Sequence, residues 1–62
     1  MWILYGDRNC VHCRTISNML QVKNIPFQYV DVGEEYETPQ LDAATGSMIV
    51  GFTNILNFLR GR

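Results

Sequence analysis

The chain has 62 residues, of which 47% are hydrophobic, and its formal net charge at pH 7 is −1. These values exclude an intrinsically disordered chain, and the scattered basic residues exclude the positive cluster typical of a nucleic-acid-binding surface. A chain of this length forms one domain, residues 1–62, and buries only about 60% of the surface that its unfolded form exposes.

The first predicted elements are a strand and a helix. Residues 2–5, Trp-Ile-Leu-Tyr, favour a β-strand that stops at Gly6. Residues 10–23 carry apolar side chains at helical spacing. Asn9 or Asp7 is expected to cap this helix, because side-chain oxygen atoms accept the unpaired N–H groups of a first helical turn.

A second strand and an irregular connector follow. Asn24 and Pro26 mark the end of the helix, since asparagine favours a left-handed C-terminal conformation and the residue before a proline disfavours the helical one. Residues 26–32 alternate between two faces and predict a strand. The acidic segment 33–39 is too short for a full helix, although one turn fits residues 34–37.

Two short strands and a helix complete the chain. Residues 40–44 predict a weak third strand, Thr45-Gly46 a hairpin turn, and residues 47–50 a fourth strand. Gly51 breaks this strand, and Thr53 is the expected N-terminal cap of the last helix. The apolar stripe of this helix consists of Phe52, Ile55, Leu56 and Leu59.

This order predicts an α/β fold, β-α-β followed by a short connector and β-β-α. A helix joins the first two strands, which are therefore parallel, whereas a tight turn joins the last two, which are antiparallel. A four-stranded mixed sheet with both helices on one face satisfies both conditions. No connector helix covers the other face, and Tyr29, Asp31 and Asp42 within strands agree with such an open face.

Residues 7–15, Asp-Arg-Asn-Cys-Val-His-Cys-Arg-Thr, contain both cysteines of the chain. Cys10 stands at the predicted helix start, where free N–H groups and the helix dipole stabilise a thiolate and lower its pKa. Arg8 adds a positive charge nearby. Cys13 lies one turn later on the same face. This spacing predicts that Cys10 attacks a substrate disulfide and that Cys13 then resolves the mixed disulfide.

His12, between the two cysteines, has two interpretations. Its ring either stabilises the Cys10 thiolate or faces solvent away from the sulfur. A structural zinc site usually has four ligands, and Cys10, Cys13 and His12 supply only three, so we expect no metal. A zinc site shared between two chains, a non-catalytic adaptor and two inert core cysteines are the alternative interpretations of the pair.

The N-terminal residues, Met-Trp-Ile-Leu-Tyr-Gly, lack the basic segment, the longer apolar run and the cleavage site of a secretory signal. No apolar run approaches the ~20 residues that cross a bilayer. We therefore expect a soluble, cytoplasmic and monomeric protein with no membrane partner and no nucleic-acid partner. Permanent disulfides are rare in the cytoplasm, so the close cysteines indicate redox chemistry or a metal.

Four segments carry a resemblance to a known family: WILYGDRNCVHC, NIPFQYVDV, TPQL and IVGFTNILNFL. Together with the predicted topology, they resemble the glutaredoxins of the thioredoxin superfamily. The resemblance is strongest to the small redoxins that supply electrons to ribonucleotide reductase. The dipeptide Val11-His12 is similar to that group, because glutaredoxins more often carry Pro-Tyr between the cysteines.

The resemblance implies a minimal thioredoxin-like fold and a thiol–disulfide oxidoreductase that reduces protein or glutathione-mixed disulfides. Cys10 is then the nucleophile and Cys13 the resolving thiol. Pro39 is then the family's cis-proline, beside which the backbone of Thr38 pairs with an extended substrate. No tightly bound cofactor is implied. Ribonucleotide reductase is a candidate target, and glutathione or thioredoxin reductase is a candidate electron source. The substrate groove would be bordered by Gly51, Phe52 and Thr53.

Two departures from the family concern the sheet and glutathione. The family usually has a helix where this chain has only residues 33–37. Members that use glutathione have an acidic residue at the start of the last helix, where this chain has Thr53 and Asn54. Arg8 then either holds a carboxylate of glutathione or is simply solvated.

The remaining aromatic residues have structural assignments. Trp2 is expected to be partly exposed on the open sheet face. Tyr36 is expected to line the substrate groove, because it stands near Pro39 in the sequence. The aromatic residues expected in the core are Tyr5, Phe27, Tyr29 and Phe58.

Overall fold

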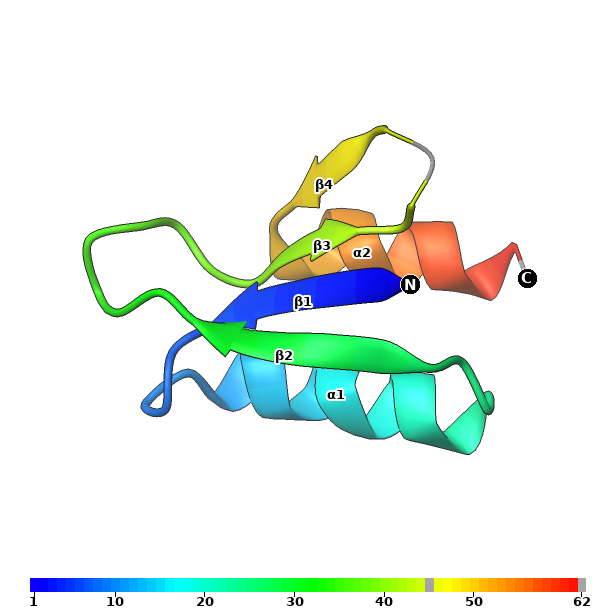
Figure 1. The fold of residues 1–62 in the computed structure, drawn as a ribbon, viewed down its shortest axis with the longest axis horizontal. Helices are drawn as coiled ribbons and strands as arrows, with labels where there is room; N and C mark the ends of the chain where they lie inside the picture. The colour runs from blue at the N-terminus through cyan, green and yellow to red at the C-terminus, as the bar shows by residue number, and fades with distance from the viewer. Residues whose placement is uncertain (45, 62) are drawn as a thin grey trace.

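Four strands form one mixed sheet in the computed structural model, which describes residues 1–44 and 46–61. In chain order the elements are β1 (Trp2–Gly6), α1 (Val11–Val22), β2 (Phe27–Asp31), β3 (Gln40–Asp42), β4 (Met48–Val50) and α2 (Phe52–Arg60). The strand order across the sheet is β2-β1-β3-β4 (Figure 1). β1 is parallel to β2 and antiparallel to β3, which is antiparallel to β4. The predicted α/β element order and mixed sheet are thus confirmed.

Both helices pack on the sheet face to which Leu4 and Leu41 point. These two leucines are direct partners in the pairing of β1 with β3, and neither has any exposed surface. Each helix adds two residues, spaced one turn apart, to the same cluster. Burying one aliphatic side chain of this size stabilises the fold by about 1.5–3 kcal/mol. The cluster consists of Leu4, Ile16, Leu20, Leu41, Ile55 and Leu59.

Trp2 lies on this helix-covered face and not on the open one. Alternate residues of a strand point to opposite faces, so Trp2 shares the face of Leu4. Its ring centroid is 5.9 Å from that of Phe58 in α2, at an interplanar angle of 47°. The expected place of Trp2 on the open face is therefore wrong, because the alternation of β1 directs its first residue toward α2.

Tyr29 and Asp31 also lie on the helix side of the sheet. The parallel register pairs Leu4 with Tyr29 and Gly6 with Asp31, so both β2 residues share the face of Leu4. Tyr29 is nevertheless 41% exposed, since it stands near the end of β2, which is an edge strand of the sheet. Tyr29 is thus neither a core residue nor a residue of the open face, and both expectations for it are wrong.

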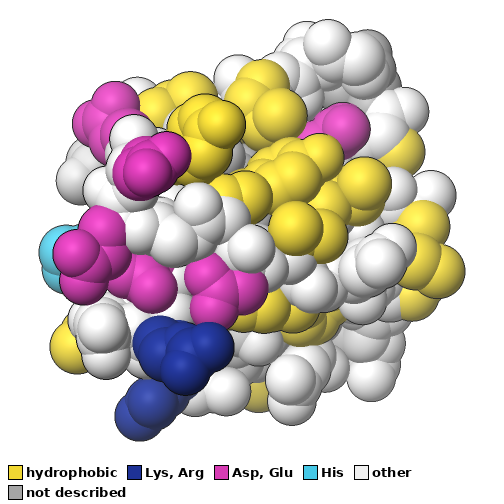
Figure 2. All heavy atoms as spheres, turned by 60° about the vertical axis from the view of Figure 1, so that its left-hand side comes forward, with side chains coloured by type: hydrophobic (Ala, Val, Ile, Leu, Met, Phe, Trp, Pro, Cys, Tyr) yellow, Lys and Arg dark blue, Asp and Glu magenta, His cyan; other side chains and the backbone are white. Residues whose placement is uncertain are grey.

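The opposite sheet face has no helix over it in residues 1–44 and 46–61. The pairing of β1 with β3 places Tyr5 beside Gln40 and Ile3 beside Asp42 on this face. Figure 2 shows hydrophobic side chains gathered across the middle of the view and acidic side chains along one border. The predicted open face and the place of Asp42 on it are confirmed, whereas Tyr5 is only half-buried there and not in the core.

The third strand ends two residues earlier than predicted. The side-chain carboxylate of Asp42 accepts the backbone N–H of Ala44 at 3.0 Å. Ala44 has a positive φ of 63°, a conformation that cannot continue a strand. β3 therefore stops at Asp42. Thr45, in the expected Thr45-Gly46 turn, lies outside the described residues.

The two helices are short and amphipathic. α1 has 12 residues and α2 has 9. Within the described part of the chain, neither helix is long and apolar enough to span a membrane. Figure 1 shows the start of α1 at the same end of the molecule as the carboxyl ends of β1 and β2. The long loop between β2 and β3 extends beyond this same end, where the cysteine motif lies.

Candidate functional site

Cys10 is the N-terminal cap of α1. Its backbone has φ −95° and ψ 108°, and its sulfur atom accepts the backbone N–H of Cys13 at 3.1 Å. The N–H of Cys10 donates to the carbonyl oxygen of Asp7 at 2.9 Å and closes the turn that follows β1. The expected caps, Asn9 and Asp7, are wrong. The residue that leaves the helical conformation is Cys10, and its sulfur takes the place of the usual cap oxygen.

The pKa of the Cys10 thiol is lowered from its ordinary value. Burial acts in the opposite direction and raises it, but hydrogen bonds from the thiol and the backbone of Cys13 lower it. The hydroxyl group of Thr38 and the backbone of His12 lower it further. Together these hydrogen bonds outweigh burial. The result agrees with the general preference of helix N-termini for anions.

The pKa of the Cys13 thiol is raised. Burial is the largest cause, and the hydrogen bond to Cys10 favours the protonated form further. The backbone of Asp7 and the hydroxyl group of Thr38 lower it in part. Cys13 has no exposed surface, whereas Cys10 is half-buried, and both are free thiols. One thiol of the pair is thus accessible and readily ionised, and the other is enclosed and protonated.

The loop between β2 and β3 brings Thr38 to the two sulfur atoms. The peptide bond between Thr38 and Pro39 is cis, in agreement with the expectation from the resemblance. The backbone N–H of Gly51 donates to the carbonyl oxygen of Pro39 at 3.0 Å. The structure therefore gathers Thr38, Pro39 and Gly51, three of the expected substrate-binding residues, beside the cysteine pair.

The start of α2 differs from the prediction at one residue. Gly51 is the N-terminal cap, with φ 97° and ψ 147°, and the helix begins at Phe52. A φ in this range favours glycine over residues with a side chain. Thr53 is therefore an exposed residue of the first turn and not the cap. The amide of Asn54 donates instead to the carbonyl oxygen of Val50 at 2.9 Å.

His12 contacts α2 through its ring. The ring stacks on that of Phe52, with centroids 4.2 Å apart and an interplanar angle of 11°. The contribution of His12 to the lowered pKa of Cys10 comes from its backbone. Neither interpretation of His12 from the sequence included this stacking, which joins the starts of the two helices.

The side chain of Arg8 forms an ion pair with β2. Its Nε atom is 3.7 Å from a carboxylate oxygen of Asp31, and its side chain is 83% exposed. The two arginines Arg8 and Arg14 line, with Cys10, a surface hollow of about 270 Å³. The causes that lower the pKa of Cys10 are hydrogen bonds. The structure thus places Arg8 near the thiol as predicted, but its partner is Asp31.

Sequence reasoning missed Tyr29 as a residue of the site. Its hydroxyl group donates to the carbonyl oxygen of Asp7 at 3.4 Å, and its ring lines the same hollow as Cys10. A Cβ atom added to Gly6 would collide with this hydroxyl group and lie 3.0 Å from the Cβ atom of Cys13. The alternation of residues 27–31 and their parallel pairing with residues 2–6 are the sequence signals that could have placed Tyr29 here.

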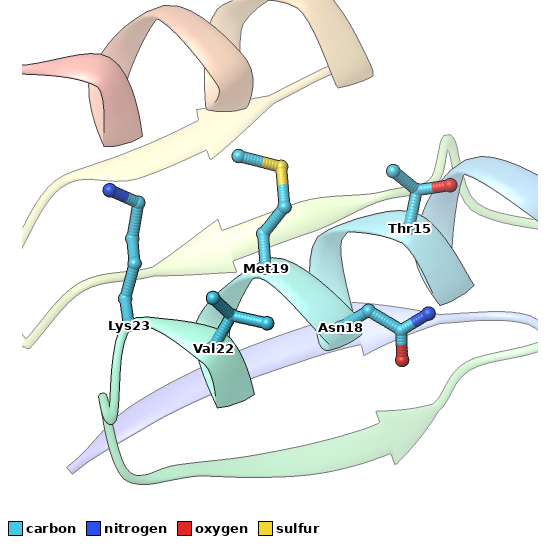
Figure 3. A pocket seen from close by; sticks show the side chains of 5 residues that line it. All are labelled: Thr15, Asn18, Met19, Val22 and Lys23. Carbon is cyan, nitrogen blue, oxygen red and sulfur yellow. The ribbon is translucent and has the colours of Figure 1, made fainter.

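Further hollows lie away from the cysteines, and two of them concern residues discussed above. Figure 3 shows one along α1, lined by Thr15, Asn18, Met19, Val22 and Lys23. Tyr36 lines the other, on the open sheet face, together with residues such as Tyr5 and Met48. Tyr36 therefore lines a different hollow from Cys10, and its expected place in the substrate groove stays a prediction.

Within residues 1–44 and 46–61, histidine, cysteine and acidic side chains do not gather in groups of three that could hold a metal ion. No protein-family model and no curated protein sequence matches the chain. The chemistry of the site therefore has to be inferred from its own geometry.

Proposed function

We propose that this protein is a dithiol–disulfide oxidoreductase with a minimal thioredoxin-like fold, similar to the small glutaredoxins. The observation that carries the proposal is the place of Cys10 as the cap of α1, where its sulfur accepts the N–H of Cys13 at 3.1 Å. Hydrogen bonds there outweigh burial and lower the pKa of Cys10, whereas burial raises that of Cys13. A nucleophile and a resolving thiol need this difference.

The reaction consists of two exchanges. The Cys10 thiolate attacks one sulfur of a substrate disulfide, bonds to it and releases the other substrate sulfur as a thiolate. Cys13 then loses its proton and attacks the sulfur of Cys10. The bond between Cys10 and the substrate breaks, and the second substrate sulfur leaves as a thiolate. Two electrons have passed to the substrate, and the protein holds a Cys10–Cys13 disulfide.

The substrate class is a protein disulfide or a mixed disulfide with glutathione. Thr38 and Pro39 lie beside the sulfur pair, and Gly51 holds Pro39 through its hydrogen bond of 3.0 Å. In this proposal the backbone of Thr38, beside the cis-proline, pairs with an extended polypeptide. Ribonucleotide reductase is one protein target of this class, and a reducing compartment such as the cytoplasm is where the exchange would operate.

Glutathione or thioredoxin reductase would return electrons to the pair. Arg8 and Arg14 line the hollow beside Cys10, and positive charge there suits the carboxylates of glutathione. Thr53 and Asn54 bring no charge to the start of α2. The charges of the site therefore suit only the carboxylates of glutathione. For this reason both glutathione and thioredoxin reductase are tested as electron sources.

The decisive experiment compares the two reductants on the same protein. Disulfide reduction is followed with glutathione and its reductase, and separately with thioredoxin reductase. The Cys10→Ser variant is expected to lose activity in both assays, although serine remains a good helix cap. The Cys13→Ser variant is expected to keep exchange with glutathione adducts, which needs no resolving thiol, and to lose reduction of protein disulfides. Full activity of the Cys10→Ser variant would refute the assigned roles.

The same preparations separate the two alternative functions. A shared zinc site predicts bound zinc in protein purified under reducing conditions, lost in both cysteine variants. A non-catalytic adaptor predicts that Cys10 reacts with an alkylating agent no faster than a cysteine in an unfolded peptide. The proposed oxidoreductase predicts faster alkylation of Cys10, because the thiolate is the reactive form.

A further inference from the structure

Tyr29 lies near Cys13 and lines the hollow that Cys10 also lines. The tip of its ring approaches Cys13 above Gly6. A Cβ atom at Gly6 would lie 2.9 Å from the Cζ atom of Tyr29 and 3.0 Å from the Cβ atom of Cys13. The tyrosine ring and the enclosed cysteine thus meet over a residue that has no side chain.

The hydroxyl group of Tyr29 anchors the ring in this position. It donates to the carbonyl oxygen of Asp7 at 3.4 Å, and the same oxygen accepts the N–H of Cys10 at 2.9 Å. The backbone of Asp7 also acts on the thiol of Cys13. The backbone of Asp7 therefore connects Tyr29 on β2 to both cysteines, and the ring position is coupled to the turn that carries Cys10.

We propose that Tyr29 fixes the order in which the two thiols react, by covering Cys13 with its ring while Cys10 stays open to an incoming disulfide. This inference deepens the proposed function and rests on it. Tyr29 is a positioning residue. It transfers neither electrons nor protons, and it acts by limiting the accessibility of Cys13.

The cover does not hinder the second exchange. Cys13 attacks the sulfur of Cys10, to which its own backbone N–H already donates a hydrogen bond of 3.1 Å. The attack forms the Cys10–Cys13 bond and breaks the bond from Cys10 to the substrate. Tyr29 can keep its place throughout. Without the ring, the thiolate of Cys13 could attack an external disulfide and release one of its sulfurs as a thiolate, and the mixed disulfide would form on the wrong cysteine.

The test uses the Cys10→Ser background, in which Cys13 is the one cysteine and serine keeps the helix cap. Adding Tyr29→Ala is expected to speed alkylation of Cys13 by iodoacetamide several-fold, because removal of the ring opens the thiol to the reagent. Tyr29→Phe keeps the ring and is expected to keep the slow rate. Glutathione disulfide is expected to label Cys13 only in the alanine variant, releasing one glutathione per mixed disulfide formed.

Two control variants distinguish the loss of the ring that covers Cys13 from a general loosening of the fold. Tyr36→Ala removes a tyrosine that is 61% exposed on another face. The alkylation rate of Cys13 is expected to stay low in this variant. Tyr29→Leu keeps an apolar side chain on β2 but is too short to reach Gly6, so it is expected to raise the rate in a protein that retains its circular dichroism. The alkylation midpoint in both exposing variants is expected at lower pH, because burial raises the pKa of Cys13.

Slow alkylation of Cys13 in folded Tyr29→Ala and Tyr29→Leu proteins would overturn the inference. Alkylation requires no disulfide substrate, so this result can occur in a chain that still reduces disulfides. Failure of the proposed function has a different signature, which is the absence of disulfide reduction by the unsubstituted chain.

Discussion

The imidazole ring of His12 lies flat against the ring of Phe52, with centroids 4.2 Å apart and an interplanar angle of 11°. His12 is the second residue of α1 and Phe52 the first of α2, so the contact joins the two helix starts. Cys10 caps one of these helices, and Gly51, next to Phe52, holds Pro39. The stacking therefore links the helix that Cys10 caps to the segment that holds Pro39.

We expect His12 and Phe52 to be energetically coupled. Stacked aromatic pairs contribute about 0.5–1.5 kcal/mol beyond the area that they bury. A double-mutant cycle of His12→Ala and Phe52→Ala, followed by denaturant unfolding, should return a coupling of this size. His12→Ala with Val22→Ala is the matched control, because Val22 lies at the other end of α1 and should be additive. Additivity of the first pair would show that the stacking contributes no stability.

Thr38→Val is expected to slow the first exchange. The Thr38 hydroxyl group is among the groups that lower the pKa of both thiols, and valine keeps its shape without donating a hydrogen bond. The pKa of Cys10, measured from the ultraviolet absorbance of its thiolate, should rise, and alkylation at neutral pH should slow. Thr53→Val removes an exposed hydroxyl group at the start of α2 and should change neither value.

Local patterns were sufficient to predict the elements and their pairing directions. The strand at residues 2–5 and the helix after it require only spacing and breaker residues. They do not determine which face of a strand the helices cover. Alternation correctly grouped Tyr29 with Asp31, but the face they share depends on the register with β1, which is a tertiary property. The wrong prediction for Trp2 has the same origin, because the face of β1 that the helices cover is also a tertiary property.

The residues that cap the two helices were the other feature that the sequence did not predict correctly. Cap preferences favour oxygen-bearing side chains, and Asn9 precedes the helix, yet the sulfur of Cys10 accepts the N–H of Cys13. At α2 the positive φ of Gly51 decides the start, although Thr53 is the better cap by side-chain chemistry. The spacing of the cysteines nevertheless placed Cys10 at the helix start and Cys13 one turn later correctly.

The stability of the Cys10→Ser variant is expected to fall as pH rises through the ordinary pKa of a thiol. Burial raises the pKa of Cys13 in the folded state, so there the folded protein binds more protons than the unfolded protein. Stability decreases with pH wherever the unfolded state binds fewer protons. The loss should continue up to the raised pKa and then level off, as measured by urea unfolding at several pH values.

The double variant Cys10→Ser/Cys13→Ser is the control for this pH dependence. It lacks both thiols and keeps every other titrating group of the chain. The difference between the two stability curves isolates the proton of Cys13. Parallel curves across the alkaline range would mean that Cys13 titrates as in the unfolded chain, and the enclosed thiol would then have no place in the mechanism.

Gly6→Ala is expected to destabilise the fold and to disturb the site at once. The added Cβ atom would collide with the hydroxyl group of Tyr29 and lie 3.0 Å from the Cβ atom of Cys13. Overpacking of this kind costs about 1–3 kcal/mol. Chemical denaturation measures the loss. Gly61→Ala is the matched control, because its added Cβ atom would meet only the carbonyl oxygen of Phe58 at 3.7 Å, an ordinary contact.

Combining Gly6→Ala with Tyr29→Phe tests the cause of that loss. The phenylalanine lacks the oxygen atom that the new Cβ atom would meet most closely, while its ring carbon at 2.9 Å remains. The double variant should therefore lose less stability than the sum of the two single variants, since neighbouring substitutions that share a contact are not additive. Strict additivity would mean that β1 shifts away from β2 when the methyl group is added, and that the tyrosine hydroxyl group does not set the space above Gly6.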